Sequence, residues 1–166
     1  MIESDHGPEV AESLARRLEG SNINPQTCLA TDYLNHFNEV VMIFGMLGDM
    51  PEMFDDIKVW EPKSYVRHFS DSNFSDRDLA IEAYEAAPGR FRIPFDSTID
   101  QLNQQVAVAI VRITQALVED RLDDVGLIGQ ATSRIMQKLI DVASGIIHGS
   151  EKGMSQADID AFMGTP

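Results

Sequence analysis

The sequence has almost none of the residues that build disulfide or zinc sites, because its 166 residues include one cysteine, Cys28. A single thiol forms no intramolecular disulfide, and no cysteine and histidine cluster with metal-ligand spacing accompanies it. A chain of this length can bury one sizeable core without such cross-links. We therefore expect a single cytoplasmic domain.

Basic side chains are also scarce, with 13 Lys and Arg against 27 Asp and Glu, for a formal net charge of −14. That charge repels phosphate backbones and anionic lipid surfaces. No stretch approaches the roughly 18 apolar residues of a membrane span, and the first residues form no signal region. We expect no nucleic acid and no membrane as partner, and instead another protein.

Enzyme motifs and strand patterns are missing as well. The chain has no glycine-rich phosphate loop, no Gly-x-Ser-x-Gly elbow and no strand-like alternation of apolar and polar residues. These absences predict an all-α fold with no cofactor of its own.

The clearest pattern present is a helical hairpin over residues 93–147. Apolar residues recur at spacings of three and four on both sides of residues 121–124: Ile99, Leu102, Val106, Ala109, Ile113 and Leu117, then Val125, Ile128, Thr132, Ile135, Leu139, Val142 and Ile146. Two long antiparallel helices follow from this spacing. Their exposed stripes predict pairing with a second copy, so we expect a homodimer.

Shorter helices are predicted around this hairpin. Pro25 begins a helix to Leu47, and prolines at 51 and 62 begin two short ones. Ser75 and Asp78 resemble a capping box that begins a helix ending at Ala87. The expected organisation is a mobile segment over residues 1–24, a helical bundle over 25–148, and a flexible linker with a C-terminal peptide over 149–166.

The C-terminal peptide has the features of a short amphipathic helix. Ser155 and Asp158 supply an N-cap and a first-turn acid, and Ile159, Phe162 and Met163 fall on one face. A helix of about nine residues is unstable alone in water, so its apolar face must contact a surface. That surface is either its own bundle or the groove of a partner.

This segment, residues 153–164, resembles the Ser-Gln-x-x-Ile-Asp-Ala-Leu peptide through which FliM- and FliN-type flagellar switch proteins and CheZ-like phosphatases bind the response regulator CheY. Phe162 and Met163 stand where that family has leucines. The resemblance implies a chemotaxis or motility protein that binds a CheY-like response regulator. The implied contact residues are Ser155, Gln156, Asp158, Ile159, Asp160, Phe162 and Met163.

A second segment, residues 127–136, is similar to the CheZ signature, with matches at Leu127, Gly129, Gln130, Arg134 and Met136. The resemblance implies that Gln130 orients a water for attack on the regulator's aspartyl phosphate. Any Mg²⁺ would then belong to the regulator.

The signature's acidic residue, four positions before the glutamine, is absent from this chain, which has Gly126 there. Asp123 and Asp124 are the nearest acids and are the candidates to replace it. The structural alternatives are a solvated polar position for Gln130 and a point of close helix approach for Gly129.

One further constellation occurs in the first predicted helix. Asp32, His36 and Glu39, at spacings of four and three, lie on one stripe beside its apolar face. Such a stripe can contribute metal ligands in a helical bundle, or it can fix helix packing by hydrogen bonds. Three functions remain: a CheY-binding protein with or without phosphatase activity, a non-enzymatic helical adaptor, and a metal-binding bundle.

Overall fold

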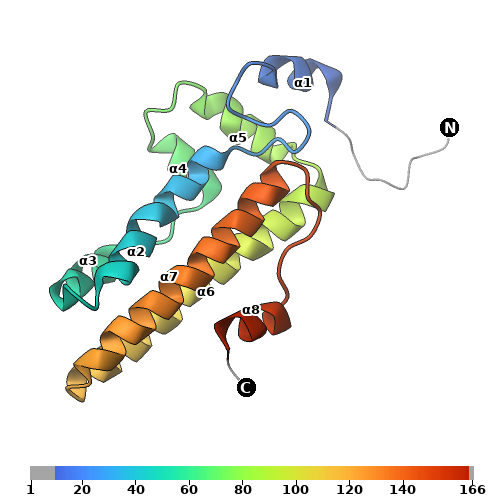
Figure 1. The fold of residues 1–166 in the computed structure, drawn as a ribbon. Coiled ribbons are helices and arrows are strands. Elements are labelled where there is room, and N and C mark those ends of the chain that lie inside the picture. Colours follow the sequence, from blue (N-terminus) through green and yellow to red (C-terminus); the bar gives the residue numbers. More distant parts are fainter. Residues whose placement is uncertain (1–9, 165–166) are drawn as a thin grey trace.

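The computed structural model describes residues 10–164, and every regular element in that range is helical, which confirms the all-α prediction. Two long antiparallel helices form the predicted hairpin, and eight shorter elements surround them (Figure 1). The elements are α1 (Glu12–Leu18), η1 (Thr31–Leu34), α2 (Asn35–Met46), η2 (Pro51–Met53), α3 (Phe54–Val59), α4 (Tyr65–Ser70), α5 (Arg77–Glu85), α6 (Gly89–Val118), α7 (Leu122–Ile147) and α8 (Gln156–Met163). Across residues 10–164, none of these helices combines the length and apolar character that crossing a bilayer demands.

The hairpin of α6 and α7 carries the predicted apolar seam, with Leu102, Ile113, Ile135 and Leu139 fully buried. A tight turn joins the helices, in which the amide of Arg121 donates to the carbonyl of Ala116 at 2.8 Å. Helix α6 begins at Gly89, four residues before the predicted start, and continues through Pro94. At the sixth helical position this proline removes one backbone hydrogen bond, a cost that packing along the remaining helix offsets.

Small residues let α2 pack closely on α7. A Cβ on Gly129 would lie 2.4 Å from the carbonyl oxygen of Phe44 and 3.3 Å from the side chain of Leu47. A Cβ on Gly126 would lie 2.8 Å from the Cα of Gly48. The backbones of the two helices therefore touch, which confirms the alternative role of Gly129 as a point of close approach.

The predicted helix from Pro25 to Leu47 is wrong over its first turns. The side-chain oxygen of Asn24 accepts from the amides of Gln26 and Thr27 at 2.8 and 3.1 Å, which forms a turn in place of a helix. Cys28 then has a φ of 62°, in the left-handed region. Regular helix begins only with η1 and α2, so the chain contributes 12 residues of α-helix there.

Two predicted short helical segments form. One begins at Pro51, and the other begins at Tyr65, three residues after Pro62. Helix α4 begins at Tyr65, and its N-cap Ser64 accepts from the amide of Arg67. The predicted Ser75–Asp78 capping box does not form: α5 begins at Arg77, and its N-cap Asp76 makes no side-chain capping bond.

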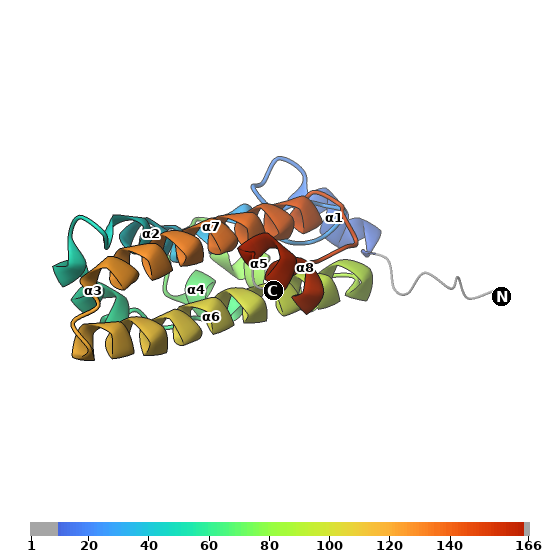
Figure 2. The same cartoon turned by 60° about the horizontal axis from the view of Figure 1, so that its bottom comes forward.

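Helix α1 belongs to the core, because Leu14 and Leu18 are buried along with the following Ile23. The part of the predicted 1–24 segment that precedes residue 10 lies outside the described residues. Figures 1 and 2 show α8 on the opposite side of the hairpin from α2. The hairpin is thus the central layer, covered by different elements on its two sides.

The contact at Gly129 predicts a stability difference between two glycines of α7. We expect Gly129→Ala to lower the free energy of unfolding by about 1–3 kcal/mol, because the new methyl group meets rigid backbone. Gly145→Ala is the matched control, since a Cβ there approaches only Ser150 at 4.0 Å. It should be neutral or stabilising by up to about 1 kcal/mol. Urea unfolding followed by circular dichroism measures both; equal effects would contradict the account.

Candidate protein-docking site

The C-terminal peptide forms the predicted helix, α8, and its own residues define both ends. The Ser155 hydroxyl accepts from the amide of Asp158, and the Asp158 carboxylate accepts from the amide of Ser155, both at 3.1 Å. This reciprocal capping box stabilises the first turn. Gly164, with a φ of 71°, ends the helix. The positions at which the helix begins and ends are therefore encoded locally, while its stability depends on the surface that its apolar face contacts.

The apolar face of α8 is split between the bundle and solvent. Ile159 is 2% exposed and packs into the core, and Met163 is half-buried beside it. Phe162 remains 47% exposed. Of the two surfaces that the sequence allows for this peptide, its own bundle is the one occupied in this structure.

A strap over residues 149–155 leads to α8 and is fixed to α6. The side-chain amide of Gln101 donates to the carbonyl of Met154 at 2.7 Å. A Cβ on Gly153 would lie 3.2 Å from the hydroxyl of Thr98, so the strap lies directly on the helix. Arg90 and Glu151 form an ion pair at 3.3 Å. Where the sequence predicts a flexible linker, the chain is held by these polar contacts.

The polar face of α8 is exposed. Gln156 donates to Asp160 at 3.0 Å along this face. Asp158 is engaged in the capping box. Of the residues that the resemblance implicates, Gln156, Asp160 and Phe162 are accessible, and Ile159 is not.

Gln130 lies on the exposed side of α7 and makes no side-chain hydrogen bond within residues 10–164. Leu127, one turn earlier, is 64% exposed, and Arg134, one turn later, is also exposed. Asp123 lies two turns before Gln130 on the same exposed stripe. A partner protein can therefore reach this side of the hairpin.

The acid of the CheZ signature has no room in this fold. At its position, Gly126, a Cβ would lie 2.8 Å from the Cα of Gly48, which follows the end of α2. The carboxylate of Asp124, one of the two acids that could stand in for it, pairs with Arg121 at 2.5 Å. Within the described chain, Gln130 is thus an accessible glutamine without an acidic neighbour one turn before it.

Asp32, His36 and Glu39 do not converge on a common point. Asp32 pairs with His68 at 3.0 Å, and His36 Nε2 donates to the carbonyl of Glu61 at 2.8 Å. Glu39 is exposed to solvent. Between Val10 and Gly164 no group of three His, Cys, Asp or Glu side chains is placed to hold a metal ion.

Asp32 and His36 instead hold the segment over residues 60–68 against the bundle by hydrogen bonds, which is the structural alternative predicted for these residues. The ring of His36 stacks on Trp60 at 4.7 Å between centroids, and Trp60 Nε1 donates to the carbonyl of His36 at 3.1 Å. Burial lowers the pKa of His36 below its usual 6.5. The neutral imidazole is therefore the form that fits this contact.

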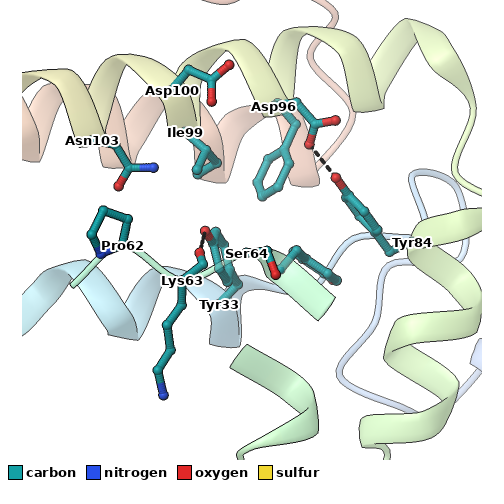
Figure 3. Close-up of a pocket in the computed structure, with 11 residues that line it drawn as sticks. Tyr33, Pro62, Lys63, Ser64, Tyr84, Asp96, Ile99, Asp100 and Asn103 are labelled. Carbon is teal, nitrogen blue, oxygen red and sulfur yellow. Dashed lines mark hydrogen bonds between the residues drawn. The ribbon is translucent and has the colours of Figure 1, made fainter. Parts of the chain in front are cut away.

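A cavity of about 390 Å³ that the sequence does not predict lies between the first half of α6, residues 62–65, Tyr33 and Tyr84 (Figure 3). Tyr84 donates to Asp96 at 2.8 Å, and Tyr33 donates to the carbonyl of Lys63 at 2.5 Å. Burial raises the pKa of Asp96. Figure 3 shows the Lys63 side chain pointing away from the cavity.

The hydroxyl groups of Tyr33 and Tyr84 are thus used in hydrogen bonds within the protein. The cavity lies where α5, α6 and the segment before α4 pack together. The residues that line this cavity are far apart in the sequence, so no local sequence pattern predicts it.

Comparison of the chain with protein-family models, curated proteins and solved structures gives no match. The function therefore has to be argued from the residues and their geometry.

The environment of His36 predicts a pH dependence of stability. A lowered pKa in the folded state means that the unfolded chain binds the proton first as the pH falls. Stability should therefore decline as the pH drops below about 6.5. We expect His36→Gln to reduce this slope between pH 7.5 and 5, whereas His148→Gln, at the exposed end of α7, should not. Identical slopes in urea unfolding for wild type and His36→Gln would contradict the assignment.

Proposed function

We propose that the protein is a cytoplasmic chemotaxis or motility protein that binds a CheY-like response regulator through α8. The observation that carries the proposal is a helix capped by its own Ser155 and Asp158, tethered by a short strap, that presents Phe162 beside Ile159. A locally encoded amphipathic helix on a tether is suited to the helix-in-groove mode of recognition. The resemblance of residues 153–164 to the CheY-binding peptide names the partner.

Binding through the apolar face requires that α8 leave its own bundle. Ile159 and Met163 cannot contact the hairpin and a partner groove together. Moving an isoleucine from the core into water costs about 1.5–3 kcal/mol, and the Gln101 bond adds about 0.5–1.5 kcal/mol. A partner groove that buries Phe162 as well as Ile159 offsets this cost, because Phe162 gains contacts that the bundle does not give it.

Phe162 offers the direct test. We expect Phe162→Ala to weaken binding to a phosphorylated CheY-like regulator roughly 30-fold, since aromatic anchors contribute about 2 kcal/mol at such interfaces. Folding should be unaffected because the side chain is 47% exposed in the free protein. Isothermal titration calorimetry measures the affinity, and Val59→Ala, at an exposed position of α3, is the control.

Deletion of residues 154–166 should abolish the same binding. An unchanged affinity after either the deletion or Phe162→Ala would contradict the docking function.

Dephosphorylation of the bound regulator is the second function that we propose, and the exposure of Gln130 favours it. An unbonded amide on an accessible helix face can orient a water for in-line attack, and phosphoryl transfer needs chiefly such positioning. The metal and the aspartyl phosphate are both supplied by the regulator. The chain's own contribution is then one side chain and the geometry of α7.

We expect Gln130→Ala to return the rate of phosphate loss from the regulator to that of unassisted decay while leaving its affinity unchanged. Gln137→Ala, another exposed glutamine of α7, is the matched control and should keep the wild-type rate. Stopped-flow or phosphate-release assays measure these rates. No acceleration by the wild-type chain would contradict the phosphatase activity and leave the docking function to stand on its own test.

A further inference from the structure

The outer side of α6 carries a row of exposed apolar side chains in the half of the helix nearest the hairpin turn. Val108, Val111 and Val118 are 47%, 66% and 81% exposed. With Gln104 and Gln115 they form a stripe at alternating spacings of four and three, the spacing of a helix-pairing seam. We call these five residues the α6 stripe.

The monomer leaves the α6 stripe uncovered. The residues of the opposite face, Leu102, Val106, Ala109 and Ile113, are the ones that pack on α7. Val111 therefore points directly away from the bundle. Figure 2 shows α6 along one edge of the molecule, with α8 in front of its first half and α2 on the far side of α7. Exposed valines on a solvent-facing helix have a free-energy cost that a partner surface would remove.

The lack of acidic side chains over residues 101–118 is what allows a second copy of this chain to be that partner. Residues 101–118 carry one charged side chain, Arg112, in a chain of which 24% of residues are charged and whose net charge is −14. Two such copies repel each other over most of their surface. The α6 stripe is a face on which they can meet without opposing carboxylates. Arg112 lies to its side, in a cavity with Asp124, Leu127 and Ala131 of α7.

We propose that two copies of the protein pair through the α6 stripe, antiparallel about a two-fold axis at Val111. Gln104 and Val118 lie seven residues on either side of Val111, so each faces the other's counterpart across the axis. A two-fold interface needs such a self-complementary patch. The result is a four-helix arrangement of two hairpins, with α6 inside and α7 outside.

This inference is independent of the proposed function, because Gln130 is on α7 and Phe162 is on α8, outside the stripe. Sedimentation equilibrium at protein concentrations of roughly 10–100 µM tests the pairing directly. The wild-type chain should have twice its mass of 18.4 kDa. Val111→Asp should give the monomer with unchanged helicity by circular dichroism, since it places two carboxylates at the axis. Val59→Asp, at a 76% exposed position of α3, should remain dimeric.

A cross-link provides a second measurement that does not depend on folding of a charged variant. The one native thiol, Cys28, is buried, and burial raises its pKa to about 11, so it does not compete. Val111→Cys should form an intermolecular disulfide on mild air oxidation, two thiols losing two hydrogens to oxygen, whereas Val59→Cys should not. A monomeric wild-type chain, or equal cross-linking of the two variants, would overturn the proposal.

Discussion

The burial of Ile159 against its own hairpin is the interaction on which the functional account depends. One side chain cannot occupy the bundle and a partner groove together, so its position couples the fold to recognition. Release costs a few kcal/mol, because α8 gives up the burial of Ile159, the partial burial of Met163 and the Gln101 hydrogen bond. A cost of roughly 2–4 kcal/mol leaves a free-tail population on the order of 0.1–3%, and the affinity for the proposed partner is lowered by the same factor.

Glycine residues allow the close packing of α7 on α2. Gly126 and Gly129 let the backbone of α2 lie directly on α7, and this contact fixes the helix that presents Gln130 to solvent. The same contact leaves no room for an acidic side chain at position 126, because its Cβ would lie 2.8 Å from the Cα of Gly48. Position 126 therefore serves helix packing.

Periodic patterns predicted the elements that depend on a repeating apolar face. The spacing of apolar residues was enough to predict the hairpin, and Ser155 was enough to predict the N-terminal cap of α8. The prediction of a helix from Pro25 was wrong because the Asn24 side chain forms a turn and Cys28 takes a left-handed conformation. The spacing of apolar residues carries no information on either feature. The place of Ile159 could not be predicted, since an apolar face fits its own bundle and a partner equally well. The contact of Tyr84 with Asp96 could not be predicted either, because it depends on the packing of different helices against each other.

Hydrogen–deuterium exchange of the wild-type chain, alone and with a phosphorylated CheY-like regulator, tests the equilibrium of α8 most directly. The account predicts that the amides of residues 156–163 exchange at least tenfold faster than those at the centre of α7 in the free protein, because α8 opens at a cost of only a few kcal/mol. They should become protected when the regulator binds. Amides of α8 that exchange as slowly as the α7 core, or that gain no protection with the regulator, would contradict the account.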